Sequence, residues 1–119
     1  MNRQSLGRRG EELAEKFLKK LKYKIVERNF NTRFGELDII AQQGAEIVFV
    51  EVRTRTSTDF MTPAESVDYL KQGRLRKTAE IWLSKNYPSD IPPARFDVVS
   101  VTFDAKGNPM IEHFPDAFV

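Results

Sequence analysis

The chain has 119 residues, 19 lysines and arginines against 17 aspartates and glutamates, a net charge of +2 and no cysteine. We expect one domain over residues 1–119, since this length supports a single core. The near balance of charge does not by itself indicate nucleic-acid binding, and disulfides, thiolate metal sites and cysteine nucleophiles are excluded. Neither a signal-type apolar segment nor a membrane-length run is found, so we expect a cytoplasmic protein that does not span a membrane.

The first predicted element is a helix from Ser5 to about Lys22. Apolar or small residues recur there at helical spacing, while arginine, lysine and glutamate occupy most of the other positions. The apolar positions are Leu6, Gly10, Leu13, Ala14, Phe17, Leu18 and Leu21. The pattern predicts an amphipathic helix.

Three strands are predicted next. Residues 23–29 suit a short strand and residues 31–35 a turn, and the apolar runs 37–40 and 47–53 form a hairpin that continues to about Arg55. In the register that matches apolar residues across the hairpin, the pairs are Gln42–Ile47, Ile40–Phe49, Ile39–Val50, Asp38–Glu51 and Leu37–Val52.

Residues 54–62 are polar, and we expect a mobile segment there. A second helix is predicted over residues 64–86, with Pro63 in its first turn and a core face of Val67, Leu70, Leu75, Ala79, Trp82 and Leu83. A proline-containing loop precedes residues 95–103, a central strand covered on both faces, and a turn at residues 106–109 leads to a last strand at 110–114. The order α-β-β-β-α-β-β predicts an α/β fold, a mixed central sheet flanked by helices.

Two acidic residues, Asp38 and Glu51, interrupt the apolar runs of the hairpin. Directly opposed side chains share a face with Cβ atoms about 4.5–5.5 Å apart, and Arg53, two residues after Glu51, lies on that face. Such close carboxylates repel unless a cation lies between them, and Mg²⁺ and Mn²⁺ prefer oxygen ligands. The pair predicts a divalent-metal site; the alternative is two acids neutralised by Arg53 and Arg55.

Three further residues are interpreted as structural. Asp97 follows Arg95 at strand spacing and lies among hydrophobic residues, which favours an internal ion pair over catalysis. His113 is the only histidine and favours a surface or packing role. Trp82 is interpreted as a core residue rather than a platform for base stacking.

Five segments carry a resemblance to a known family: Gly10-Glu11, Arg28-Asn29, residues 35–38, residues 49–53 and residues 95–99. Together they resemble the YraN-like family of small bacterial proteins over nearly the whole chain. The resemblance implies a restriction-endonuclease-like fold, close to archaeal Holliday-junction resolvases, and the activity of a nuclease.

The resemblance also implies roles for individual residues. Asp38 matches the first metal-binding acid, Glu51 the second, and Glu11 an acid on the first helix that approaches the same metal; a solvated helix residue is the alternative for Glu11. Arg53 stands where the usual Asp…Glu-x-Lys motif has lysine. Because arginine stays protonated, Arg53 could orient a phosphate or steady the transition state but could not be the general base. The metal, Glu11 or another lysine such as Lys71 would then activate the water.

The expected function is Mg²⁺- or Mn²⁺-dependent endonucleolytic hydrolysis of DNA, with branched DNA and a homodimer implied only by the likeness to resolvases. The alternative is a nucleic-acid-binding module that keeps the fold and has little catalysis. Basic side chains beside the acids are expected to contact phosphates with little sequence selectivity. They are Arg33, Arg53, Arg55, Lys71, Arg74, Arg76 and Lys77.

Overall fold

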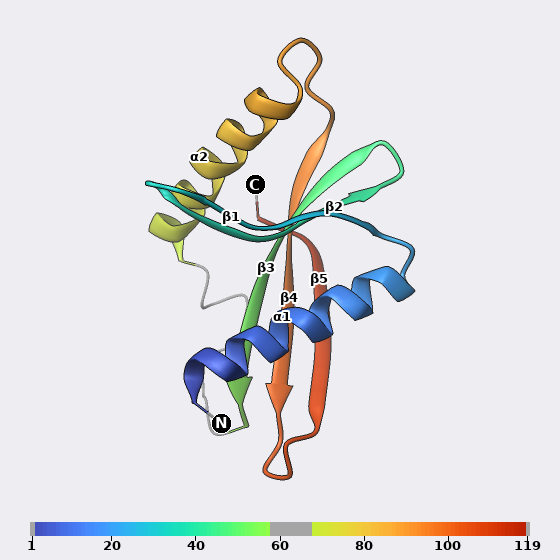
Figure 1. Ribbon diagram of the computed structural model, residues 1–119, viewed down its shortest axis with the longest axis vertical. Coiled ribbons are helices and arrows are strands. Elements are labelled where there is room, and N and C mark those ends of the chain that lie inside the picture. Colours follow the sequence, from blue (N-terminus) through green and yellow to red (C-terminus); the bar gives the residue numbers. More distant parts are fainter. Residues whose placement is uncertain (1, 58–67, 119) are drawn as a thin grey trace.

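The computed structural model describes residues 2–57 and 68–118, and it confirms the predicted order of elements. The helices are α1 (Arg3–Lys20) and α2 (Tyr69–Asn86). The strands are β1 (Lys24–Thr32), β2 (Gly35–Gln43), β3 (Glu46–Thr56), β4 (Ala94–Phe103) and β5 (Pro109–Phe118). They form one sheet in the order β1-β2-β3-β4-β5, in which only β3 and β4 are parallel. The predicted mixed α/β fold is therefore present (Figure 1).

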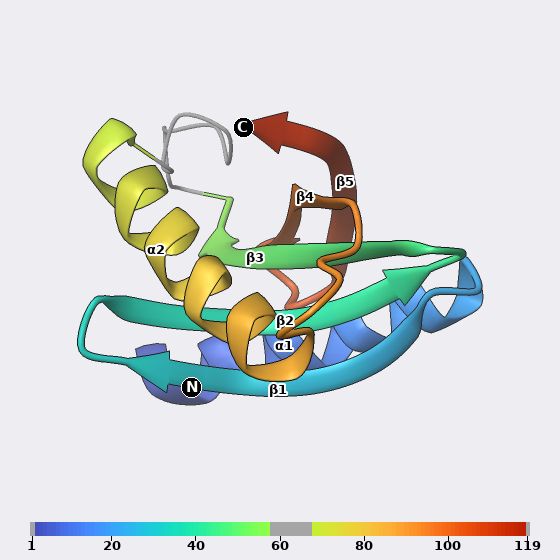
Figure 2. The same ribbon diagram turned by 90° about the horizontal axis from the view of Figure 1, so that it is seen from above.

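The two helices lie on opposite faces of the sheet, and each covers its own apolar layer (Figure 2). Val48, Val50 and Val52 of β3 belong to the layer under α1, whereas Ile47 and Phe49 belong to the layer under α2. This alternation is the period of two expected of a strand. Strand β4 is likewise buried on both faces, as its sequence predicts.

Trp82 anchors α2 to the sheet. Its side chain is fully buried, its ring meets Phe49 edge to face, and its indole N–H donates a hydrogen bond to Glu27 Oε1 at 2.9 Å. The predicted core role is confirmed. Among the described residues, neither helix is both long and apolar enough to cross a membrane.

The start of α2 differs from the prediction. Asp68 has extended backbone angles (φ −73°, ψ 173°), and its side chain accepts a hydrogen bond from the Lys71 backbone N–H, so it caps a helix that begins at Tyr69 rather than Ala64. Leu70, expected in the core, is 70% exposed because this first turn precedes the part of α2 that packs on the sheet. Predictions for residues 58–67, including Pro63 and Val67, lie outside the described residues.

The strands are longer than predicted. Strand β1 pairs with β2 as far as Thr32–Gly35, so the expected five-residue turn contains only Arg33 and Phe34. Strand β5 continues to Phe118 rather than ending near Phe114. The β2–β3 connection is also a two-residue turn, in which Gly44 has a positive φ of 61°.

The register predicted for β2 and β3 is confirmed over part of its length. The pairs Gln42–Ile47, Ile40–Phe49 and Ile39–Val50 are all present. The continuation through Asp38–Glu51 and Leu37–Val52 is wrong, because the ladder ends at Ile39–Val50.

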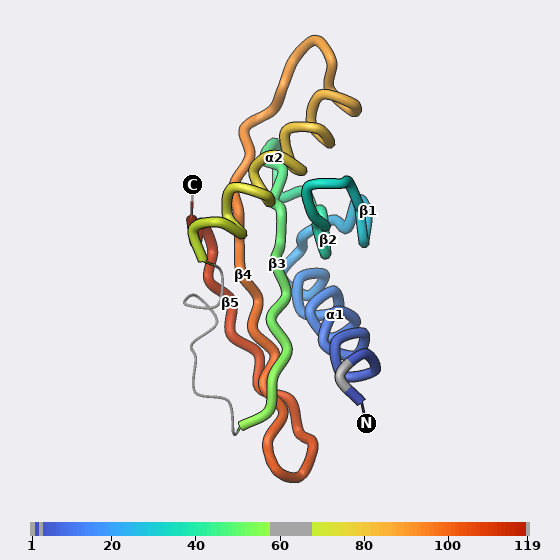
Figure 3. The backbone as a smooth tube through the Cα atoms, turned by 90° about the vertical axis from the view of Figure 1, so that its left-hand side faces the viewer, coloured from blue at the N-terminus to red at the C-terminus, as the bar shows by residue number. Residues whose placement is uncertain are grey.

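A bend in the β1–β2 hairpin accounts for this early end. Asn29 adopts a left-handed conformation (φ 55°) between the pairs Arg28–Ile39 and Phe30–Leu37, directly across from Asp38. From there the hairpin turns across the long strands (Figures 1 and 3). Instead of pairing along the strand, Asp38 accepts a hydrogen bond from the Val52 N–H through its carboxylate Oδ2 at 2.9 Å.

Candidate metal centre

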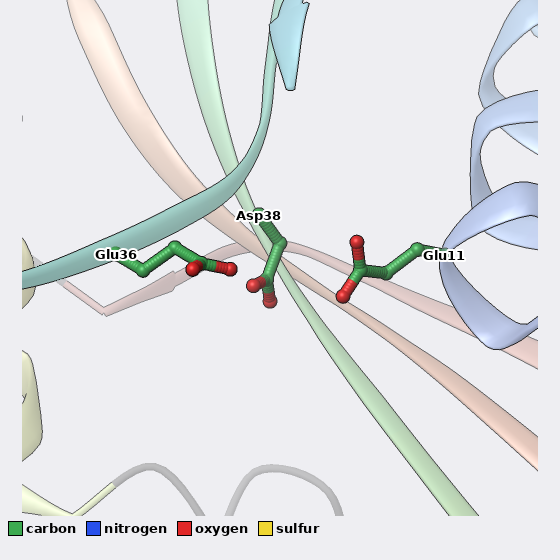
Figure 4. A group of neighbouring side chains, drawn as sticks. All are labelled: Glu11, Glu36 and Asp38. Atoms are coloured by element: carbon green, nitrogen blue, oxygen red, sulfur yellow. The ribbon is translucent and has the colours of Figure 1, made fainter. Parts of the chain in front are cut away.

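Three carboxylates converge where β2 parts from β3. Asp38 and Glu36 extend from β2, and Glu11 extends toward them from α1 (Figure 4). One oxygen of each lies within 4.8 Å of the others. Oxygens bound to one Mg²⁺ at about 2.1 Å would lie about 3.0 Å apart in cis and about 4.2 Å in trans. Small side-chain rotations would therefore bring these three onto one octahedral ion.

Glu51 is a neighbour of this group but has different partners. Its side chain is 7% exposed, and its Oε1 lies 3.2 Å from Lys71 Nζ and 3.9 Å from Arg53 Nη1. Its negative charge also acts on the nearby Asp38 carboxyl and raises its pKa. The predicted closeness of Asp38, Glu51 and Arg53 is thus observed. Among the described residues, however, the group with metal-ligand spacing contains Glu36 and not Glu51.

Glu36 was missing from the site predicted from the sequence. It precedes Asp38 by two residues on one strand, so strand alternation places both carboxylates on one face. This spacing is a signal in the sequence, but Glu36 stands outside the nuclease motif and the motif therefore does not indicate it.

Arg28 and Asn29 hold Glu11 in this cluster. Arg28 lies 3.5 Å from Glu11 Oε1 and 3.8 Å from Glu15 Oε1. With its amide nitrogen turned toward the acids, Asn29 donates to Glu11 Oε1 at 3.1 Å and to Glu36 Oε1 at 3.2 Å. Glu11 therefore faces the acids from a partly buried position, contrary to the alternative of a solvated helix residue.

Burial, together with nearby negative charge, raises the pKa of two of these groups. Burial, the negative charge of Glu51 and a hydrogen bond to Glu51 raise the pKa of Asp38 from 3.8 to about 9, against the opposing effect of the Val52 N–H. Burial also raises the pKa of Glu11, although Arg28 partly offsets it. A divalent cation would relieve both effects by stabilising the charged carboxylates.

The Asp38 shift predicts how stability depends on pH. Between about pH 4 and pH 9 the metal-free folded protein keeps a proton on Asp38 that the unfolded chain has released, so raising the pH favours unfolding. We expect Asp38→Asn to remove much of this loss of stability. Urea unfolding of both proteins in EDTA, near pH 5 and near pH 8, measures it. Equal pH slopes for variant and wild type would contradict the prediction.

Three of the predicted phosphate-binding residues gather at the β1–β2 turn. The Arg33 guanidinium lies 4.9 Å from the centroid of the Phe34 ring, and Lys77 Nζ lies 5.7 Å from it. Arg74 packs beside the neighbouring Gly35.

The four other predicted phosphate-binding residues lie elsewhere. Arg53 is paired with Glu51, and Arg76 lines a pocket with Phe49 and Glu80. Lys71, on the same helix as Arg74 and Lys77, reaches Glu51 instead. Arg55 is opposite Thr102 near the carboxyl end of β3, away from the turn (Figure 1). The predicted rim is therefore divided. Arg33, Arg74 and Lys77 form one compact group, and the other four side chains lie apart from it.

The internal ion pair predicted for Asp97 is confirmed. Its fully buried carboxylate accepts hydrogen bonds from Arg95 Nε at 2.9 Å and from the Asp116 N–H at 3.0 Å. His113 Nε2 lies 2.7 Å from the same carboxylate, and its ring packs edge-on against Phe17. The interpretation of His113 as a packing residue also holds.

The architecture is that of a restriction-endonuclease-like α/β domain, and the acids are positioned as a candidate metal centre. Residues 10–101 match the model of the uncharacterised protein family UPF0102, and the chain belongs to this family, the YraN family. It is 48% identical to a UPF0102 protein of Geobacter metallireducens over 99% of this chain and 95% of that protein. It is 49% identical to one of Syntrophomonas wolfei over 99% of this chain and all of that protein.

Proposed function

We propose that this protein is a divalent-metal-dependent endonuclease that hydrolyses DNA phosphodiester bonds, branched DNA among its substrates. One observation carries the proposal: three carboxylates with metal-ligand spacing adjoin a buried glutamate that is paired with a lysine. Nuclease chemistry requires a metal-bound phosphate and a group that can handle a proton. Both requirements have candidates here.

Glu11, Glu36 and Asp38 would hold Mg²⁺ or Mn²⁺. They offer only hard oxygen ligands, which suit these ions, and a cation would favour the charged form of Asp38 against the effects of burial and of Glu51. When bound, the ion would polarise a phosphoryl oxygen and lower the pKa of a coordinated water. Glu51 would act on this site through its interaction with Asp38, and it would not be one of the three closely spaced ligands.

Lys71 could supply the proton-exchanging amine that Arg53 cannot provide. Arg53 stands where the nuclease motif has lysine, and it can orient a phosphate but cannot give up a proton. Lys71 Nζ extends from α2 and contacts Glu51, the glutamate that is also near Arg53. Its side chain is 33% exposed, so it can reach a substrate phosphate. We propose that Lys71 takes the place of the motif's lysine in the site. Glu51 would position the Lys71 amine, and Arg53 would stabilise negative charge in the transition state.

Arg33, Arg74 and Lys77 would hold the DNA backbone on the same side of α2 as Lys71. Contacts to phosphate position a duplex without reading its sequence, so we expect binding that weakens steeply with salt and has little sequence preference. Symmetric cutting of a four-way junction would additionally require two copies of the site, and hence a homodimer.

Cleavage assays test the proposed function directly. Purified protein is incubated with labelled linear, flapped and four-way DNA in Mg²⁺, in Mn²⁺ or in EDTA. We expect cutting in metal and none in EDTA, and Asp38→Asn should reduce the rate by at least about 100-fold, because a metal ligand is lost. Asp90→Asn, at an exposed aspartate between α2 and β4, is the matched control and should cut like the wild type.

The outcomes separate the two candidate functions. DNA binding without cutting under every metal condition would favour a binding module that keeps the nuclease fold. Cutting that survives Asp38→Asn at full rate would point to a contaminating nuclease and would remove the support for this site.

A further inference from the structure

An apolar groove lies on the molecule apart from the acids. It has a volume of about 620 Å³ and runs between the second half of α1 and strand β5. Its apolar lining consists of Leu13, Phe17, Leu21 and Ile111. Leu21, the C-cap residue of α1, is 45% exposed at one end of this lining.

The groove exists because α1 does not cover the whole sheet. The helix packs mainly on β3, with smaller contacts to β1, β2 and β4. At the β5 edge the side chain of Ile111 reaches the α1 core but is only partly buried. Eight residues separate Leu13 from Leu21, about 12 Å of helix at about 1.5 Å per residue. The groove is thus two helical turns long.

The charge beside the groove has a single sign. Lys16, Lys19 and Lys20 line it, and no acidic side chain of the described part of the chain does. Lys19 pairs with Glu15 at 3.5 Å, but among residues 2–57 and 68–118 neither Lys16 nor Lys20 forms an ion pair. An apolar floor with a lysine rim suits an occupant that has both apolar anchors and negative charge.

We propose that this groove docks an acidic amphipathic helix of a partner protein. Leucine-like side chains at positions i, i+3, i+4 and i+7 of the partner would fill the floor between Phe17 and Ile111, as in other helix-in-groove complexes. Glutamates or aspartates on the flanks of that helix would meet Lys16 and Lys20. The partner would be held on the flank of α1 opposite to the one that carries the Glu11–Arg28 pair.

Other occupants fit these features less well. A second copy docked through the same groove would bring Lys16 and Lys20 of both copies together, and their repulsion opposes such a dimer. DNA would meet an apolar floor instead of the cations that its phosphates need. A membrane surface is flat, and it would leave a hollow of this volume unfilled.

The test uses a synthetic helical peptide of about 14 residues, with leucines at i, i+3, i+4 and i+7 and glutamates on both flanks, and a twin with lysine in place of glutamate. Fluorescence anisotropy measures binding of each labelled peptide to the full chain. We expect the acidic peptide to bind and its twin not to bind. Leu21→Glu and the double variant Lys16→Glu/Lys20→Glu should each weaken the acidic peptide at least about tenfold.

Met110→Glu is the matched control. Met110 is 64% exposed and adjoins Ile111 on β5, so its side chain points to the other face of the sheet and binding should be unchanged. Circular dichroism checks that each variant folds; Leu21 is already largely exposed, so its replacement should be tolerated.

Three results would overturn the proposal. One is that the acidic and basic peptides bind equally well, or that neither peptide binds. Another is binding of the acidic peptide that Leu21→Glu and the lysine double variant leave intact. The third is co-sedimentation with phosphatidylglycerol vesicles that needs Leu21 and Lys16 while the peptides do not bind, since a membrane would then be the occupant.

Discussion

Lys71→Met is expected to lower metal-dependent DNA cleavage by about 100-fold or more, the usual effect of losing a group that handles a proton or stabilises charge in the transition state. Lys71 is the only lysine within 4 Å of a carboxylate oxygen of Glu51 among the described residues. Methionine keeps much of the length of the side chain and removes its charge. Mn²⁺ affinity, measured by calorimetry, should change little, because Lys71 does not contact the group with metal-ligand spacing.

Two companion variants make this result interpretable. Lys77→Met removes a lysine from the same helix beside Phe34, so it should weaken DNA binding without the large loss of cleavage rate. Lys71→Arg separates two roles. The variant should keep its cleavage activity if only the positive charge is needed, and it should lose that activity if the side chain must exchange a proton. A Lys71→Met protein that cuts at the wild-type rate would contradict the assignment of the amine to Lys71.

Gly10→Ala is expected to destabilise the protein by about 1–3 kcal/mol, the typical range for an added methyl group in a close-packed contact. A Cβ atom on Gly10 would overlap the Thr54 hydroxyl on β3, so α1 must shift outward to accommodate it. Glu11 is the next residue on this helix and would move with it. We therefore expect weaker Mn²⁺ binding as well as a lower urea midpoint.

Gly7→Ala provides the control in the same helix. Apart from the helix's own backbone and the neighbouring residues, no atom of the described residues lies within 4 Å of the position of its Cβ. The substitution should therefore stabilise α1 by about 0.5–1 kcal/mol through the better helix propensity of alanine. A double variant, Gly10→Ala with Thr54→Ala, should recover part of the lost stability because it removes the overlapping hydroxyl. Equal effects of Gly7→Ala and Gly10→Ala would show that the contact with Thr54 is unimportant.

Much of the fold could be predicted because it depends on local patterns. Helical spacing from Leu6 to Leu18 indicated α1, and the apolar runs on either side of Gly44 indicated the register of β2 and β3. Those signals come from residues close together in the chain. The end of α2 near Asn86 is predicted by the same kind of signal, whereas its start depends on the cap at Asp68, which apolar spacing does not indicate.

The site could be predicted only in part. The sequence by itself indicated that Asp38, Glu51 and Arg53 would be neighbours, and its motifs indicated the family. Strand alternation places Glu51 and Arg53 together, but Asp38 approaches them where β2 leaves β3 and not as the strand partner of Glu51. Only the tertiary structure decided that Glu36 and Glu11 join Asp38 and that Lys71 reaches Glu51. These contacts join side chains of α1, α2, β2 and β3 that are far apart in the chain. They depend on the bend at Asn29 and on helix packing across distant parts of the chain, which periodicity does not encode.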